Sequence, residues 1–165
     1  MADTYEKLME GFAGESQANH KYLAFAQKAD QEGFSQAAKL FRAAAHAETI
    51  HAINHLKAAG EVKSTEENLK TAIAGENYEH TEMYPAFMKV AEAEGESKAL
   101  RSFNWANEVE KVHEALYLQA LETLEKPGEA YDYYICPICG YTHARVAPEK
   151  CPVCGVPGER FLRIA

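Results

Sequence analysis

Four cysteines near the end of the chain form two copies of one short motif. Residues 136–140 and 151–155 both read C-x-x-C-G, and 11 residues separate the two loops. Each loop can present two thiolates to one cation, and the glycine that follows permits a tight backbone turn. The spacing predicts one tetrahedral four-sulfur site, formed by Cys136, Cys139, Cys151 and Cys154. Tetrahedral sulfur binds zinc or iron, so the motif alone leaves the metal open.

A second set of chemically active residues combines carboxylates with imidazoles. A Glu-x-x-His pair occurs twice, and each pair follows an isolated Glu by 33 or 34 residues. The two sets are Glu15 with Glu48 and His51, and Glu76 with Glu110 and His113. A Glu and a His three positions apart lie one turn apart on the same helix face. The repeated spacing indicates a duplicated helix pair.

The carboxylates lie on helix faces that should be buried. The residue spacing gives each predicted helix one apolar stripe, and a Glu interrupts every stripe near its middle. Glu79 lies on the same stripe as Glu76 and is the fifth such Glu. Ionised carboxylates in a helix-bundle core are costly unless they bind a cation. The pattern matches ferritin-like di-iron and di-manganese proteins, in which two helices each supply a Glu and two each supply a Glu-x-x-His. We therefore predict a two-metal site.

Helices must position these ligands, and residues 1–126 have the composition of helices. They are rich in Ala, Glu, Lys and Leu, with Pro85 as their only proline. We predict helices over residues 3–31, 35–59, 65–94 and 97–126, with Gly33, Gly60 and Gly95 just beyond three helix ends and a capping box from Ser64 to Glu67. Pro85 should kink the third helix. The predicted fold is an all-α, ferritin-like four-helix bundle.

The remaining residues predict a separate small domain. We assign the bundle to residues 1–126, a linker to 127–130 and a metal-stapled β and loop domain to 131–165. A segment this short rarely folds without a metal or a disulfide.

Charge and hydropathy exclude several classes of protein. Residues 127–165 carry four acidic and four basic side chains, so the whole net charge of −8 lies on residues 1–126. Such acidity argues against nucleic acid as a partner. We see neither a membrane-spanning apolar run nor a secretory signal, and expect a cytoplasmic protein that does not bind a membrane.

Taken together, these motifs closely resemble the rubrerythrin family. The resemblance rests on residues 12–18 (FAGESQA), both Glu-x-x-His turns, residues 75–85 and both cysteine loops. It implies a ferritin-like di-iron domain followed by a rubredoxin-like iron domain. It also implies a peroxidase that reduces hydrogen peroxide to water in oxidative-stress defence, with electrons from rubredoxin or an NAD(P)H-dependent reductase passing through the cysteine-bound iron. The implied cofactors are two Fe in the bundle and one Fe in the cysteine site, with zinc as the alternative for the latter.

The resemblance also implies roles for individual residues. Glu48 and Glu110 bridge the metals, Glu15, Glu76 and His113 are terminal ligands, and Glu79 and His51 alternate as ligands of one iron between redox states. Tyr22 and Tyr84 match family tyrosines that hydrogen-bond the carboxylates; otherwise they are ordinary core aromatics. His55 is expected to be a core histidine or to support a ligand, and His80 to have a surface or hydrogen-bonded role.

Two further expectations concern assembly and rival functions. The linker is short and the di-iron site lies mid-bundle, so we expect the cysteine domain not to reach its own chain's di-iron site. This predicts a homodimer in which each cysteine domain lies near its partner's bundle. The alternatives are a ferroxidase or iron-storage protein, and a non-enzymatic metal-binding protein with a zinc ribbon.

Overall fold

The computed structural model describes residues 3–126 and 128–165, and these form two compact units that divide after Lys63. The linker predicted at 127–130 lies within the second unit, and its Pro127 is outside the described residues. The predicted domain boundaries therefore stay a prediction.

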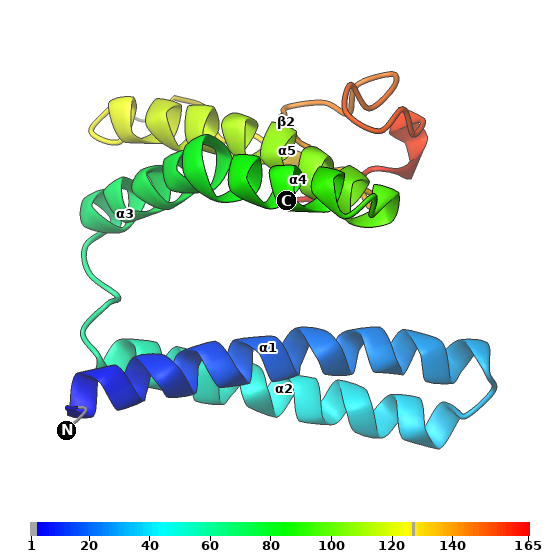
Figure 1. The fold of residues 1–165 in the computed structure, drawn as a ribbon. Helices are drawn as coiled ribbons and strands as arrows, with labels where there is room; N and C mark the ends of the chain where they lie inside the picture. Colours follow the sequence, from blue (N-terminus) through cyan, green and yellow to red (C-terminus); the bar gives the residue numbers. More distant parts are fainter. Residues whose placement is uncertain (1–2, 127) are drawn as a thin grey trace. The chain divides into compact units, whose positions relative to one another are not determined.

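The first unit is a pair of helices joined by a tight turn (Figure 1). Helix α1 spans Thr4–Gln31 and α2 spans Ser35–Ala58, each within one residue of prediction. Gly33 has a φ of 82°, the left-handed conformation that ends a helix without a Cβ clash. The two helices approach through small side chains; the buried residues here are Ala26, Ala29, Ala38, Ala45 and Ala52.

The second unit begins with another helix pair. Helix α3 spans Thr65–Tyr78, a π-helical segment η1 spans Glu79–Met83, α4 spans Tyr84–Ala93 and α5 spans Ser97–Glu122. The predicted capping box is confirmed, because the Ser64 side chain accepts from the Glu67 N–H while the Glu67 carboxylate accepts from the Ser64 N–H. Helix α5 ends four residues before the predicted position, where the Thr123 hydroxyl donates to the Gln119 carbonyl.

A π-helical segment occurs where the sequence predicted a kink at Pro85. Proline has no N–H for an i−4 hydrogen bond, and here it lies in the first turn of α4, directly after η1. The insertion of one residue into an α-helix produces such a wide turn. The repeat reveals this insertion, because Glu15 and Tyr22 are seven residues apart whereas Glu76 and Tyr84 are eight apart.

The cysteine-containing segment is a small antiparallel sheet with two metal-binding loops. Strands β1 (Tyr133–Ile135), β2 (Thr142–Ala144) and β3 (Leu162–Ile164) are arranged in the order β2-β1-β3, and η2 (Gly158–Arg160) is a 3₁₀ turn. At Gly158 any Cβ would lie 1.7 Å from the Pro148 carbonyl oxygen, so this close backbone approach requires glycine.

Among the helices of the described residues, none is both long and apolar enough to cross a membrane.

The helices and strands together form a ferritin-like helical body followed by a small rubredoxin-like strand and loop domain.

Candidate metal centres

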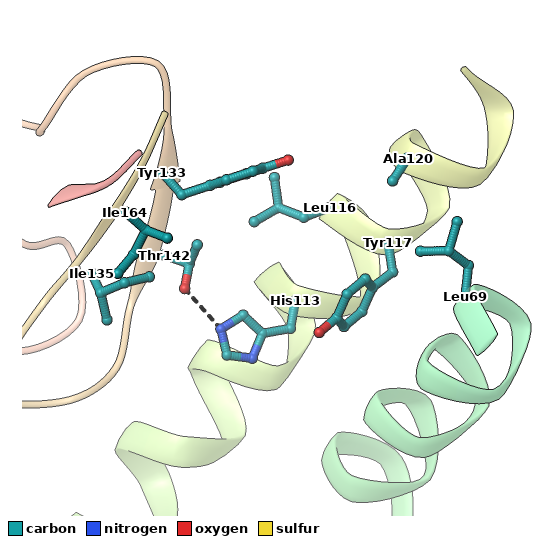
Figure 2. Close-up of a pocket in the computed structure, with 9 residues that line it drawn as sticks. All are labelled: Leu69, His113, Leu116, Tyr117, Ala120, Tyr133, Ile135, Thr142 and Ile164. Atoms are coloured by element: carbon teal, nitrogen blue, oxygen red, sulfur yellow. Dashed lines mark hydrogen bonds between the residues drawn. The ribbon is translucent and has the colours of Figure 1, made fainter. Parts of the chain in front are cut away.

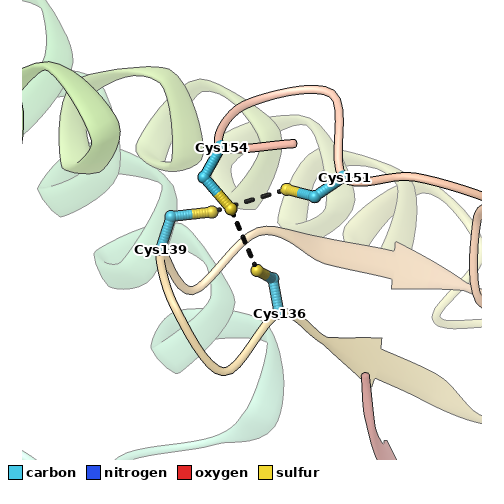
Figure 3. Close-up of side chains that lie close together, drawn as sticks. All are labelled: Cys136, Cys139, Cys151 and Cys154. Atoms are coloured by element: carbon cyan, nitrogen blue, oxygen red, sulfur yellow. Dashed lines mark hydrogen bonds between the residues drawn. The ribbon is translucent and has the colours of Figure 1, made fainter. Parts of the chain in front are cut away.

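The four cysteine sulfurs converge on one point, as predicted (Figure 3). The Sγ atoms of Cys136 and Cys154 are 3.5 Å apart, as are those of Cys139 and Cys151, and all four lie within 4.8 Å of one another. A tetrahedron of sulfurs about 2.3 Å from a metal has edges of about 3.8 Å. The thiols therefore fit a single tetrahedral metal ion.

The two loops have the same backbone structure. The Gly140 N–H donates to the Cys136 carbonyl and the Gly155 N–H to the Cys151 carbonyl, with φ angles of 82° and 81° at the two glycines. Burial raises the pKa of the Cys139 and Cys154 thiols. At Cys151 burial acts in the same direction, but the backbone N–H groups of Cys154 and Val153, with the thiols of Cys139 and Cys154, outweigh it and lower the pKa to about 7. Backbone donors of this kind stabilise the thiolate form that binds metal.

The first unit brings together three of the predicted ligands. Nδ1 of His51 lies 2.9 Å from Oε2 of Glu48 and 3.8 Å from Oε1 of Glu15. We call Glu15, Glu48 and His51 the first triad. Its ligand atoms lie within 4.8 Å of one another, close enough for a single cation to bind all three.

The second unit repeats the arrangement with a more buried set. Nδ1 of His113 lies 2.8 Å from Oε2 of Glu110 and 3.9 Å from Oε1 of Glu76. We call Glu76, Glu110 and His113 the second triad. The side chain of His113 is 28% exposed, against 54% for His51. The fourth predicted ligand of this unit, Glu79, begins the π-helical segment.

The carboxylates of the second unit are held in an environment that disfavours negative charge. Burial, followed by repulsion from Glu110, raises the pKa of Glu76 to about 7. Burial and the charge of Glu110 also raise the pKa of Glu79. The hydrogen bond to Glu110 raises the pKa of His113. A cation among these groups would relieve this repulsion, so the donor set fits a metal site.

The two predicted tyrosines lie in equivalent aromatic clusters. Tyr22 packs with Phe25 and Phe41, and Tyr84 packs with Phe87 and Phe103, with ring centroids 5.5–6.4 Å apart. Burial and the nearby charges of Glu110, Glu79 and Glu76 raise the pKa of Tyr84. Neither hydroxyl donates a hydrogen bond within the described part of the chain, so hydrogen bonding to the ligands stays a prediction.

The cysteine domain contacts α5 of its own chain beside the second triad. Nε2 of His113 lies 2.9 Å from Oγ1 of Thr142 on β2 (Figure 2). The site for a Cβ on Gly140 is 3.9 Å from Cγ1 of Val109, which is buried on α5. Our expectation that the domain cannot reach its own chain's ligands is therefore wrong for His113. The domain docks against the side of α5 beside His113. The chain therefore does not have to extend along half the length of a helix to reach that residue.

An apolar cavity of about 440 Å³ lies beside this contact (Figure 2). Residues of α3, α5 and all three strands line it: Leu69, His113, Leu116, Tyr117, Ala120, Tyr133, Ile135, Thr142 and Ile164. His113, Thr142 and the two tyrosines contribute its polar side-chain atoms.

Sequence reasoning missed Thr142 and the partner of His80. Nε2 of His80 lies 2.6 Å from Oε2 of Glu114, which also accepts from the Asn77 amide. The hydrogen-bonded role expected for His80 is confirmed. Glu114 follows Glu110 by one further turn, and this spacing is the signal that could have identified it. Thr142 carries no comparable signal, because it approaches His113 only through tertiary packing.

Comparisons with known proteins agree with this architecture. The Rubrerythrin family model matches residues 6–121, and the model described as the rubredoxin-like domain of rubrerythrin matches residues 134–162. Nigerythrin of Nitratidesulfovibrio vulgaris is 38% identical, over 98% of this chain and 86% of its own. Rubrerythrin-2 of Clostridium acetobutylicum is 34% identical, over 97% and 96%. The solved structure of fully reduced, all-ferrous nigerythrin covers 99% of this chain and 88% of its own at 37% identity, with a TM-score of 0.61. The chain belongs to the rubrerythrin family.

Proposed function

We propose that this protein is a non-haem di-iron peroxidase that reduces hydrogen peroxide to water in oxidative-stress defence. Its electrons would come from rubredoxin or an NAD(P)H-linked reductase and pass through iron bound by the four cysteines. The protein would act in the cytoplasm. The family has a di-iron site in its helical domain and a four-cysteine site in its rubredoxin-like domain, and this chain carries donor groups for both. A relative solved in an all-ferrous state supports iron as the metal.

One observation carries the proposal. The cysteine domain packs on α5 so that Thr142 contacts His113, a member of the second triad. A ferroxidase or iron store has no evident use for a four-thiolate site beside its ligands, whereas a peroxidase needs an electron supply there. Zinc has no redox chemistry, so this function requires iron in the cysteine site.

The seven predicted ligands have distinct tasks in this proposal. Reduction of hydrogen peroxide to two water molecules consumes two electrons and two protons, and the iron pair supplies the electrons when bound. Carboxylates offset the charge of the cations, and imidazole gives each a softer nitrogen donor. We assign these tasks to Glu15, Glu48, His51, Glu76, Glu79, Glu110 and His113. Tyr84, beside three of the carboxylates, offers a phenolic O–H as a proton or hydrogen-bond donor.

An anaerobic stopped-flow experiment tests the function. The fully reduced, iron-loaded protein is mixed with one equivalent of hydrogen peroxide, and the visible bands of both iron centres are followed. We expect rapid oxidation of the di-iron site, and oxidation of the cysteine-bound iron as more peroxide is added. A cysteine centre that never changes colour, or mineral core formation on aeration with iron, would contradict the proposal.

We also propose that the protein is a homodimer whose bundles are completed by a second copy. Ferritin-like folds contain one long crossover between helices. A crossover along the 24 residues of α2 has to span about 36 Å. The longest helix-to-helix connection in the described residues is 59–64, and six residues reach at most about 25 Å. Helix α2 also leaves Leu40, Ile50 and Ile53 at least 43% exposed. These observations support α1 and α2 of one copy packing with α3 to α5 of another.

Mixing two complementary variants tests the exchange. One variant lacks the first triad and the other lacks the second, and the two are unfolded and refolded together. In an exchanged dimer, the mixture contains one complete ligand set and binds metal that neither variant binds alone. A monomer by light scattering, or a mixture with no gain in metal binding, would contradict the proposal.

A further inference from the structure

Thr142 connects the two kinds of metal site through two hydrogen bonds. Its Oγ1 lies 2.9 Å from Nε2 of His113 and 3.2 Å from the Gly140 carbonyl oxygen, to which it donates. Gly140 follows Cys139 directly in the first cysteine loop. Figure 2 shows the bond between Thr142 and His113. The Thr142 residue is 8% exposed, so solvent competes little for these bonds.

The two contacts of Thr142 suit the His113 tautomer that metal binding requires. When Nδ1 gives its lone pair to a cation, the neutral imidazole carries its proton on Nε2. The Thr142 oxygen can then accept from Nε2 while its own hydrogen is donated to the Gly140 carbonyl. Nδ1 is then the nitrogen that faces Glu110 and Glu76, at 2.8 Å and 3.9 Å. This is the atom whose lone pair a cation in the second triad would use.

We propose that Thr142 is a positioning residue for His113, and that it makes metal binding by the second triad depend on a filled cysteine site. The proposal rests on the assignment of His113 as a metal ligand in the proposed function. Thr142 begins β2, two residues after the first cysteine loop. A segment of about 35 residues depends on its metal for folding, so an empty cysteine site would release Thr142 and with it the orientation of the His113 ring.

The first triad has no such support and provides an internal comparison. In the described residues, the only hydrogen bond of His51 joins Nδ1 to Glu48, and its side chain is 54% exposed. Coupling between metal sites is reciprocal, so a metal in the second triad should also favour the filled, folded cysteine domain.

The test measures metal affinity rather than peroxide turnover. The metal-free full chain first receives one equivalent of Zn²⁺, which fills the four thiols, and Co²⁺ is then titrated anaerobically while its visible bands are recorded. We expect Thr142→Val, which removes only the hydroxyl, to weaken Co²⁺ binding about 10- to 100-fold. Thr142→Ser should restore it. Thr123→Val is the matched control, because that hydroxyl donates to backbone carbonyls near the end of α5.

A second arm tests the dependence on the cysteine site. In a Cys136→Ser/Cys139→Ser chain, Co²⁺ binding to the helical ligands should weaken by a similar factor, and adding Thr142→Val should cause no further loss. Wild-type affinity in Thr142→Val, or equal losses from Thr142→Val with and without the cysteines, would overturn the proposal. If Thr142→Val fails to take up Zn²⁺, the difference in Co²⁺ affinity between the Zn²⁺-filled wild-type chain and the Cys136→Ser/Cys139→Ser chain decides the coupling. Failure of the stopped-flow experiment would leave this result standing, so the two proposals fail separately.

Discussion

The two helix pairs of this chain repeat one arrangement but differ in what surrounds it. In each pair a Glu approaches a Glu-x-x-His turn, and a tyrosine packs with two phenylalanines. Only the second pair has an extra carboxylate at Glu79, a π-helical segment and a threonine behind its histidine. A duplicated scaffold can thus become chemically asymmetric through one inserted residue and one docked domain.

The asymmetry extends to burial and charge. In the first triad the histidine is half exposed, whereas the second triad is more buried and its Glu76 has a raised pKa. Burial strengthens electrostatic interactions between ligands and ion. We therefore expect the second pair to be the half of the ligand set that interacts more strongly with its ions.

The largest expected effect comes from removing one histidine or the other. His113→Ala should weaken Fe²⁺ binding by more than about 100-fold. Loss of a residue that only hydrogen-bonds to a metal ligand typically costs about 10- to 100-fold, and loss of the ligand itself should cost more. His51→Ala should weaken it less, about 10-fold, because the side chain of His51 is 54% exposed and its interaction with an ion is weaker than that of the more buried His113. Anaerobic Fe²⁺ titration measures both, with the exposed His46→Ala as the control. Equal losses in the two variants would remove the distinction between the halves.

Combining changes at Glu79 and His51 sharpens the comparison. The counterpart of Glu79 in the first pair is Ala18, three residues after Glu15, so Glu79→Ala makes the two halves alike at this position. If Glu79 and His51 alternate as ligands of one iron, each single variant should keep two metals in one oxidation state. The double variant should keep only one metal ion in both oxidation states. Metal content after gel filtration of oxidised and reduced protein checks this, and two metals in the double variant would contradict it.

The pH dependence of stability should differ between the halves. The pKa of Glu76 is about 7 in the folded chain and near 4.5 when unperturbed, so the folded state binds the proton more tightly. Its contribution is therefore present below pH 4.5 and lost as the pH rises through 7. With Zn²⁺ in the cysteine site and no metal in the helices, the unfolding free energy should fall between pH 5 and 8. Glu76→Gln should flatten this fall, and Glu15→Gln is the matched control. Urea unfolding at both pH values measures the change, and an unchanged slope in Glu76→Gln would exclude this cause.

Much of this arrangement could be predicted from the sequence, because it depends on local spacing. Helix ends at Gly33, Gly60 and Gly95 follow from single residues, and the Ser64 capping box from a pair three positions apart. Both ligand triads follow from a Glu-x-x-His turn that recurs 33 or 34 residues after an isolated Glu. The cysteine loops follow from the motif itself. The π-helical segment was missed because helix propensity does not distinguish π from α turns. The contact of Thr142 with His113 was missed because it depends on how the chain folds back along α5, which no local pattern encodes.

The smallest expected effect concerns the two tyrosines, which the sequence predicts to serve the ligands alike. Tyr84 lies where the charges of Glu110, Glu79 and Glu76 raise its pKa, so its phenol stays protonated near neutral pH and can donate to a ligand or to peroxide-derived oxygen. Tyr84→Phe should slow peroxide reduction a few-fold and leave Fe²⁺ affinity nearly unchanged, since both rings fill the same aromatic cluster. Tyr22→Phe should have a weaker effect, because Tyr22 belongs to the half with fewer buried carboxylates. Single-turnover stopped-flow mixing of the reduced variants with peroxide separates these rates. Equal slowing in both would show that the tyrosines retained the symmetry of the duplication, and that the difference between the halves is confined to the ligands.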